Sequence, residues 1–430
     1  MTTIRQFSLI ALAMLAMTGR VTMLGSSRWT GAGGSYRSVQ RFFATGMPWA
    51  PLFWRFFRTQ LFQADDVYLV GGDETVVTKA GKQTHGLDRF VASLYGKRVP
   101  GLAFFTLSLI STTQRRSLPI AVEQVLRTPE EKAAVRAKTA ATPAPQRKPG
   151  RPKGSSTKAK TTVELSPELT RIQTMLLQVL ARSGALIPLT YLVLDGHFGN
   201  NAALQMAQHC TLHLISKLRS DSARSLPYDG PYAGRGPRRI SGDKIDPRAI
   251  PERYLRQTAV ADGIETRTYQ VAARHKTVAQ PLNGVGILKT NLKTQAQAHG
   301  ILCRSVLVLS WDKLIDYSCR RCQLAFNFRD AKQYWGLEDF MATSPTAVTN
   351  AANLSLFMVN LVERMLQQVR QRQPTGSVLD LKAHCRGAKY VEETIKLLPE
   401  TPEPILLERI FAKIVGIGRL HAAPADPIPA

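Results

Sequence analysis

The sequence predicts a mixed α/β fold, because apolar runs of strand length alternate with stretches of helical period. Residues 67–79 begin with a continuous apolar run, and residues 102–111 are another, as is typical of strands in the middle of a sheet. Residues 167–183 have the spacing of a helix and lead into a further strand at residues 186–194. Residues 350–371 predict an amphipathic core helix. We therefore expect a buried sheet with helices packed against it.

Charge indicates the kind of partner. The chain of 430 residues exceeds one typical domain and suggests two or three parts around a sizeable core. Its 57 Lys and Arg outnumber 31 Asp and Glu, which leaves a formal net charge of +26. Nucleic acid is the first choice of partner, because cations that release counterions from phosphates gain affinity. An anionic membrane surface is the alternative.

The start of the chain and the cysteines bear on the compartment. Residues 7–17 form an apolar run after Arg5 that could serve as the core of a secretory signal, but it is too short to span a bilayer. A buried first helix is the better interpretation. The five cysteines are scattered and odd in number, which favours reduced thiols in a cytoplasm. Cys319 and Cys322 have zinc spacing, but both would lie on one helix, so we expect no metal there.

Residues 1–62 look helical and basic. Two short helices around a Gly-rich turn could place Arg37 and Arg41 against DNA. A helical bundle that docks on the next domain is an equal alternative. Aromatic residues between positions 49 and 57 recur at helical spacing, which favours packing over base stacking.

Residues 128–162 are rich in Ala, Pro, Lys and Thr and predict a solvated linker without a fold of its own. Residues 147–155 within it resemble an AT-hook, in which Arg151 could enter a narrow minor groove. Arg147, Lys148 and Lys153 would contact the same DNA. A plain basic linker that contacts phosphates has equal weight.

Two aspartates are placed for metal chemistry. Asp73 follows two glycines that would let another chain segment or a ligand approach closely, and Asp195 ends the apolar run that precedes it. A buried carboxylate is costly unless it is paired or binds a cation, and ligand sites in α/β sheets favour such strand ends. Carboxylates suit Mg²⁺, and a pair of such ions can activate water for phosphodiester cleavage. His197 could touch a metal, although a loop histidine bonded to backbone is commoner.

Strand candidates at residues 212–218, 266–273 and 285–289 alternate with basic loops and predict a β-rich insertion. Residues 305–310 predict one more strand. Residues 317–338 then predict a single helix. A buried stripe is expected on it from Leu324, Phe328, Ala331 and Trp335, beside a line of Arg321, Ala325, Phe328 and Lys332.

This helix resembles the signature of DDE transposases encoded by bacterial insertion sequences, in which Tyr, Arg, Glu and Lys share one helix followed by Phe-Arg-Asp-x-Lys-Gln. Residues 72–90 also resemble the first-aspartate segment of these proteins, and the resemblance extends unevenly from about residue 15 to about residue 420. Arg321 and Lys332 keep the family's intervals, but position 325 is Ala where the family has its third metal-binding carboxylate. Tyr317 stands one residue further from Arg321 than the pattern expects.

The resemblance implies an RNase H-like mixed sheet flanked by helices, with a β-rich insertion and a helical N-terminal DNA-binding region. It implies that Asp73 and Asp195 bind two Mg²⁺ or Mn²⁺ ions, while Tyr317, Arg321 and Lys332 contact DNA phosphates. The expected parts are residues 1–62 for DNA binding, 63–127, 163–211 and 302–375 for the catalytic core, 128–162 for the linker, 212–301 for the insertion and 376–430 for a helical tail.

The implied activity is metal-dependent hydrolysis and strand transfer on terminal inverted repeats and target DNA, by a homodimer or larger synaptic assembly in the bacterial cytoplasm, associated with the nucleoid and with no membrane. Because Ala325 replaces an acid, we expect this activity to be impaired or absent. Two alternatives are a DNA-binding protein without catalysis and a nuclease of the same fold that never joins strands.

Overall fold

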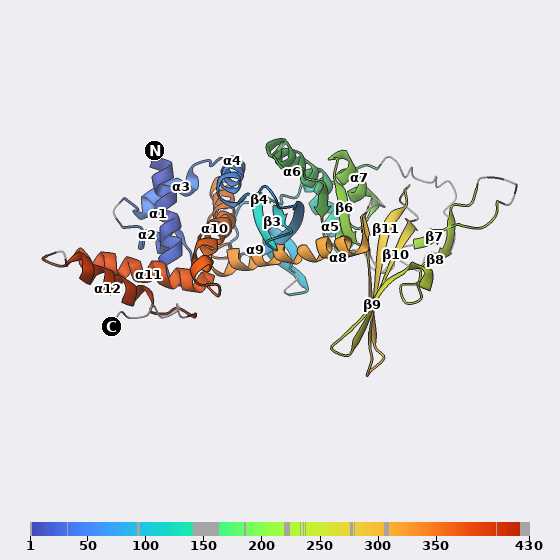
Figure 1. Ribbon diagram of the computed structural model, residues 1–430. Helices are drawn as coiled ribbons and strands as arrows, with labels where there is room; N and C mark the ends of the chain where they lie inside the picture. Colours follow the sequence, from blue (N-terminus) through green and yellow to red (C-terminus); the bar gives the residue numbers. More distant parts are fainter. Residues whose placement is uncertain are drawn as a thin grey trace, which may run out of the picture.

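The computed structural model describes residues 2–421 apart from 141–162, 219–223 and 305–308 and the positions 32, 93–94, 185, 233, 235, 237, 276–277, 279 and 401. A helical end, a central sheet and a β-rich end follow one another along the molecule (Figure 1). Among the described residues, no helix combines the length and the apolar character needed to span a bilayer.

The central sheet confirms the mixed α/β fold and is consistent with an RNase H-like core. Its middle strand pairs antiparallel with one neighbour and parallel with the other, and both neighbours pair with further strands. The five strands lie in the order β4 (Arg116–Gln124), β3 (Lys97–Ser111), β1 (Tyr68–Thr78), β5 (Tyr191–Val193) and β6 (His213–Lys217), and β2 (Asp88–Ala92) pairs with the start of β3. The strand expected at residues 186–194 is thus confirmed only in its last part.

Helices cover both faces of this sheet. On one face lies α6 (Pro167–Ser183), which occupies the expected residues, with α7 (Asn201–His209) beside it. On the other face the expected helix at residues 317–338 is present as two segments, α8 (Trp311–Arg320) and α9 (Cys322–Gln333), which meet at Arg321. The four residues expected to form the buried stripe, Leu324, Phe328, Ala331 and Trp335, are all buried.

The helical end joins segments that are far apart in sequence. Lys382 Nζ donates to the carbonyl of Met14 and Arg386 Nε to that of Ala16, which fixes the carboxyl-terminal helices on the first helix. The buried first helix expected over residues 7–17 is present up to Ala16 and is buried on one side, and the aromatic side chains of Trp49 and Phe53 pack in the core. The helices of this end are α1 (Thr2–Ala16), α2 (Met23–Ser27), α3 (Tyr36–Ala44), α4 (Trp49–Phe56), η1 (Phe57–Leu61), α10 (Pro345–Arg372), α11 (Val378–Ile395) and α12 (Pro404–Val415).

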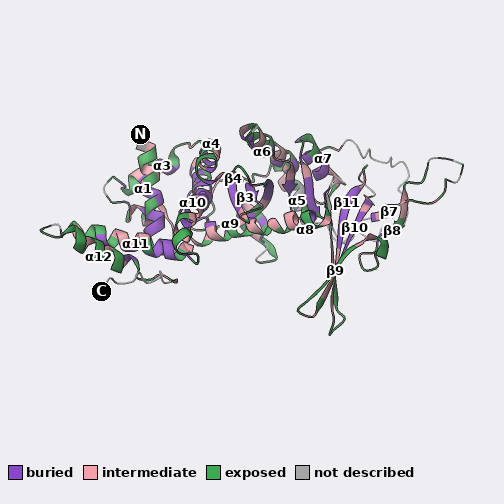
Figure 2. Ribbon diagram, viewed as in Figure 1, coloured by how far each residue is buried: buried purple, intermediate pink, exposed green. Residues whose placement is uncertain are grey.

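The β-rich end extends the same sheet. The structure places both ends of the insertion expected at residues 212–301 differently. At its start, β6 pairs in parallel with β5 and so belongs to the core sheet. At its end, β12 continues to Arg304 and pairs with β6. The remaining elements are β7 (Arg224–Pro227), β8 (Ser241–Lys244), η3 (Glu252–Tyr254), β9 (Leu255–Ala261), β10 (Ile264–His275), β11 (Leu282–Asn291) and β12 (Gln297–Arg304). The hairpin tips that project from this end are largely exposed (Figure 2). Most of the strand expected at residues 305–310 falls outside the described residues.

The expectation of a linker without structure from residue 128 is wrong at its beginning, where α5 (Pro129–Ala140) forms. Thr128 and Glu131 cap this helix reciprocally, since each accepts the backbone N–H of the other on its side chain. Glu131 also pairs with Arg171 on α6 at 3.3 Å. The AT-hook-like residues Arg147, Lys148, Arg151 and Lys153 lie outside the described residues.

Candidate active site

Asp73 lies in the middle of β1, the central strand of the core sheet. The glycine before it faces close neighbours, because a Cβ at Gly72 would lie 2.8 Å from Leu194 Cδ2. A Cβ at Gly71 would likewise lie 2.9 Å from Leu324 Cδ1 of α9. The two glycines therefore allow Leu194, just after β5, and Leu324 of α9 to pack closely against the strand just before the carboxylate.

Asp195 lies two residues after the end of β5, close enough to Asp73 for its charge to affect that carboxyl group. The two strands are parallel with Gly71 opposite Val193, and each aspartate comes two residues later, on strands about 5 Å apart. Asp195 Oδ1 accepts the backbone N–H of His197 at 3.1 Å, and its carbonyl accepts the hydroxyl of Ser216 at 2.6 Å, which fixes the loop. The structure thus brings together two carboxylates that are 122 positions apart.

Arg321 reaches this pair from the junction of α8 and α9. Its Nη1 lies 2.8 Å from Asp73 Oδ2, in a charge-assisted hydrogen bond. Burial raises the pKa of Asp73 above its usual value, Arg321 opposes this shift, and the nearby charge of Asp195 adds to it. Asp73 therefore carries a costly charge that a cation must balance, and here that cation is Arg321.

Tyr317, Ala325 and Lys332 are expected on the same helix face as Arg321. Tyr317, one turn before Arg321, packs its ring 5.3 Å from that of Tyr191 on β5. Lys332 Nζ donates to the carbonyl of Val76 on β1 at 2.8 Å and pairs with Glu338 at 3.2 Å. Ala325 comes one turn after Arg321, between two cations that both contact β1. It is exposed, so its methyl group leaves space above the strand.

The carboxylates present do not fit a site for two divalent ions. Asp73 and Asp195 are the two acids that converge here, and Asp73 is already paired with Arg321. Across the described residues, no group of three or more His, Cys, Asp or Glu side chains is arranged to hold a metal ion. A third oxygen donor from α9 is what the arrangement lacks, because position 325 supplies only a methyl group.

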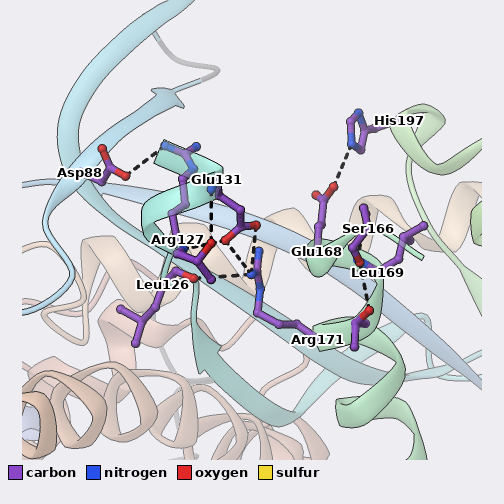
Figure 3. A network of polar contacts seen from close by, with 11 residues as sticks. Asp88, Leu126, Arg127, Glu131, Ser166, Glu168, Leu169, Arg171 and His197 are labelled. Atoms are coloured by element: carbon purple, nitrogen blue, oxygen red, sulfur yellow. Dashed lines mark hydrogen bonds and ion pairs between the residues drawn. The ribbon is translucent and has the colours of Figure 1, made fainter. Parts of the chain in front are cut away.

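A second charged cluster lies on the opposite face of the sheet from Asp73. The sequence alone does not predict it. Because neighbouring strand residues point to opposite faces, Glu74 lies on the face covered by α6, where its pKa is raised by burial and then by the charge of Glu168. Glu168 Oε2 lies 3.3 Å from His197 Nε2 (Figure 3). The only signals in the sequence were the position of Glu74 next to Asp73 and that of Glu168 in the first turn of a helix.

This cluster joins α5 to the loop that carries Asp195. Arg171, one turn after Glu168 on α6, pairs with Glu131 of α5, and Arg127 pairs with Asp88 at 3.4 Å (Figure 3). His197 therefore has a carboxylate partner, and the expectation that it would bond to backbone is wrong because the first turn of α6 brings Glu168 within reach of its ring.

We expect the His197–Glu168 pair to be visible in a pH titration. The hydrogen bond with Glu168 raises the pKa of His197 above 6.5, and the same bond lowers the pKa of Glu168. The pair stabilises the loop most between the usual pKa of the glutamate and that of the histidine, and this stabilisation is lost as the pH rises through the raised pKa of His197. NMR titration of the His197 ring should give a pKa above 6.5, which falls in Glu168→Gln; an unchanged value in the variant would contradict the pair.

The mixed sheet and its flanking helices are consistent with an RNase H-like core, a fold class that includes nucleases. The chain itself belongs to the family described as DDE superfamily endonuclease, whose model matches residues 1–282, more than half of its length. The matched part contains Asp73 and Asp195, whereas Arg321, Ala325 and Lys332 lie beyond it. No curated protein matches the chain.

Proposed function

We propose that this chain is the transposase of a bacterial insertion sequence and that its DNA cleavage is impaired by Ala325. The observation that carries the proposal is the ion pair between Arg321 and Asp73 beside that alanine. The guanidinium of Arg321 neutralises one of the two acids, as a metal ion does in a working centre. Position 325 has no carboxylate that would bind the guanidinium instead.

The proposed roles follow from the positions of the side chains. Asp73 and Asp195 would be the metal ligands in a complete centre, since nucleases of this family generally use divalent metal ions. Tyr317, Arg321 and Lys332 line the face that would meet the DNA backbone. Arg37 and Arg41 are exposed one turn apart on α3, opposite its buried side, so they are available for DNA phosphates.

We also propose that the protein acts as a homodimer or larger assembly on the terminal repeats of its element and on target DNA, in the bacterial cytoplasm. A DNA-binding protein without catalysis is the second candidate. The ion pair between Arg321 and Asp73 favours this second candidate as well. With Asp73 neutralised by Arg321, the site would bind DNA through its cations and would need no metal ion. Binding that is unchanged by EDTA and weakened by salt supports this candidate.

The test of the assignment uses duplex DNA that carries the inverted repeats flanking the coding region, with Mg²⁺ or Mn²⁺. We expect the natural sequence to cut slowly or not at all, and any cleavage to disappear in Asp73→Ala because one of the two acids is lost. Cleavage at a rate unaffected by Asp73→Ala would contradict the proposed centre. An assay for joined products separates a transposase from a purely hydrolytic nuclease.

A further inference from the structure

Two adjoining cavities of about 400 and 460 Å³ form a groove where the turn between β3 and β4 meets α9, α10 and η1. They share Gln114, Arg116 and Glu363 in their walls, so we treat them as one feature and name it the arginine groove. The cations that line it are Arg115, Arg116, Arg329, Arg364 and Arg370, against the two acids Asp330 and Glu363. The groove therefore carries an excess of positive charge.

The acids present do not satisfy these cations. Glu363 is shared between Arg116 at 3.4 Å and Arg370 at 3.6 Å, and Asp330 is taken by Arg329 at 2.8 Å. Arg364 also lines the groove, and its Nε is buried and has no hydrogen-bond partner among the described residues. A buried donor without an acceptor costs free energy, which a turn of the Arg364 side chain toward an anion bound in the groove would recover.

The cations also repel one another. Burial lowers the pKa of Arg370, Glu363 opposes this shift, and the nearby charge of Arg116 adds to it. Amide side chains complete the walls, since Gln60, Gln63, Gln367 and Gln371 lie beside the guanidinium groups. Guanidinium and amide donors together are the set that proteins commonly use to bind phosphate oxygens.

The strand register relates the groove to the acid pair. Arg116 of β4 lies opposite Ser111 of β3, which lies opposite Tyr68, five residues before Asp73 on β1. This offset is about 17 Å along the strands and about 10 Å across them, so the groove begins about 20 Å from Asp73. A duplex that passed both points would be about six base pairs long between them.

We propose that the arginine groove binds the phosphate backbone of duplex DNA on one side of the acid pair. The proposal rests on the proposed function for the identity of the ligand, and on the groove alone for its anionic character. Binding needs neither a metal ion nor a working catalytic centre. It is therefore tested independently of cleavage.

The experiment compares Arg364→Gln with the natural chain, using a labelled duplex of about 30 base pairs without element ends, in EDTA and over a series of salt concentrations. We expect binding to weaken about three- to tenfold, and the slope of log affinity against log salt to fall by about one, because one phosphate contact is lost. Without DNA, the melting temperature should stay the same or rise, because the variant removes a buried donor that has no partner. An unchanged affinity and slope would overturn the proposal.

Arg372→Gln is the matched control. It removes the same charge from the same helix, but Arg372 is exposed and does not line the groove. We expect its affinity and salt slope to match those of the natural chain. Equal losses in both variants would mean a general charge effect and overturn the proposal.

If Arg364→Gln does not fold, phenylglyoxal footprinting of the natural chain decides, since the duplex must protect Arg364. Polyglutamate that displaces the duplex as well as unlabelled DNA does would indicate an acidic protein partner and also overturn it.

Discussion

Ala325→Glu is expected to raise metal-dependent cleavage of terminal repeat DNA by about two orders of magnitude or more, the usual worth of an electrostatic group at a reacting centre. The new carboxylate would lie one turn from Arg321, within reach of its guanidinium, and would draw it off Asp73. The site would then have a new carboxylate at position 325, and Asp73 would be free of its ion pair with Arg321. Position 325 is exposed, and glutamate is a good helix former, so the longer side chain fits without repacking.

The control for this experiment is Ala325→Gln, which adds the same length without charge. Gel-resolved cleavage of labelled repeat DNA in Mg²⁺ or Mn²⁺ gives the rates. If the glutamine and glutamate variants cut equally, charge at this position has no role and the assignment of a missing acid is wrong. Adding Asp73→Ala to Ala325→Glu should remove the restored activity.

Asp380→Asn is expected to destabilise the helical end by about 3 kcal/mol, because a buried carboxylate loses several charge-assisted hydrogen bonds at once. Its oxygens accept the backbone N–H and hydroxyl of Ser377 as well as the backbone N–H groups of Leu420 and His421, and the ring of His421 lies 2.8 Å away. An amide would point N–H groups at some of these donors. Urea denaturation, with hydrogen exchange at Leu420 and His421, measures the loss.

The same contacts fix the pH dependence. Burial alone would raise the pKa of Asp380, but the hydrogen bonds from Ser377 and His421 outweigh it and hold the pKa below 3.8. This contribution to stability is therefore present above the usual pKa of aspartate and is lost as the pH falls through the lowered value. Glu393→Gln is the control: Lys389 and Lys396 lower the pKa of Glu393 to about 2, but it is fully exposed and should change stability little. Equal effects would contradict the role of burial.

The sequence predicts the strand that carries Asp73 and the last part of the strand before Asp195, because their apolar runs are too long for loops and lead to an acid. It also predicts the line of Arg321, Ala325 and Lys332, since helical periodicity fixes which residues share a face. These features are local and follow from spacing. The choice of Asp73 and Asp195 as metal ligands rests in addition on the family resemblance, and it stays a prediction.

Contacts between distant segments could not be predicted in the same way. The ion pair between Arg321 and Asp73 joins residues 248 positions apart, and no periodicity encodes it. Whether β6 belongs to the core or to the insertion depends on pairing with β5, which propensity does not specify. Composition does not predict the capped α5, because a stretch rich in Ala and Lys is typical of a linker, although Thr128 and Glu131 form a capping pattern.

The helical end has a consequence for biosynthesis. Trp49 Nε1 donates a hydrogen bond at 2.8 Å to Asn350 Oδ1, which lies 301 positions later. A ribosome that adds about 5–20 residues per second needs about 15–60 seconds to cover that interval. During this time the aromatic residues of the first helices lack Phe357 of α10, against which they pack in the folded protein.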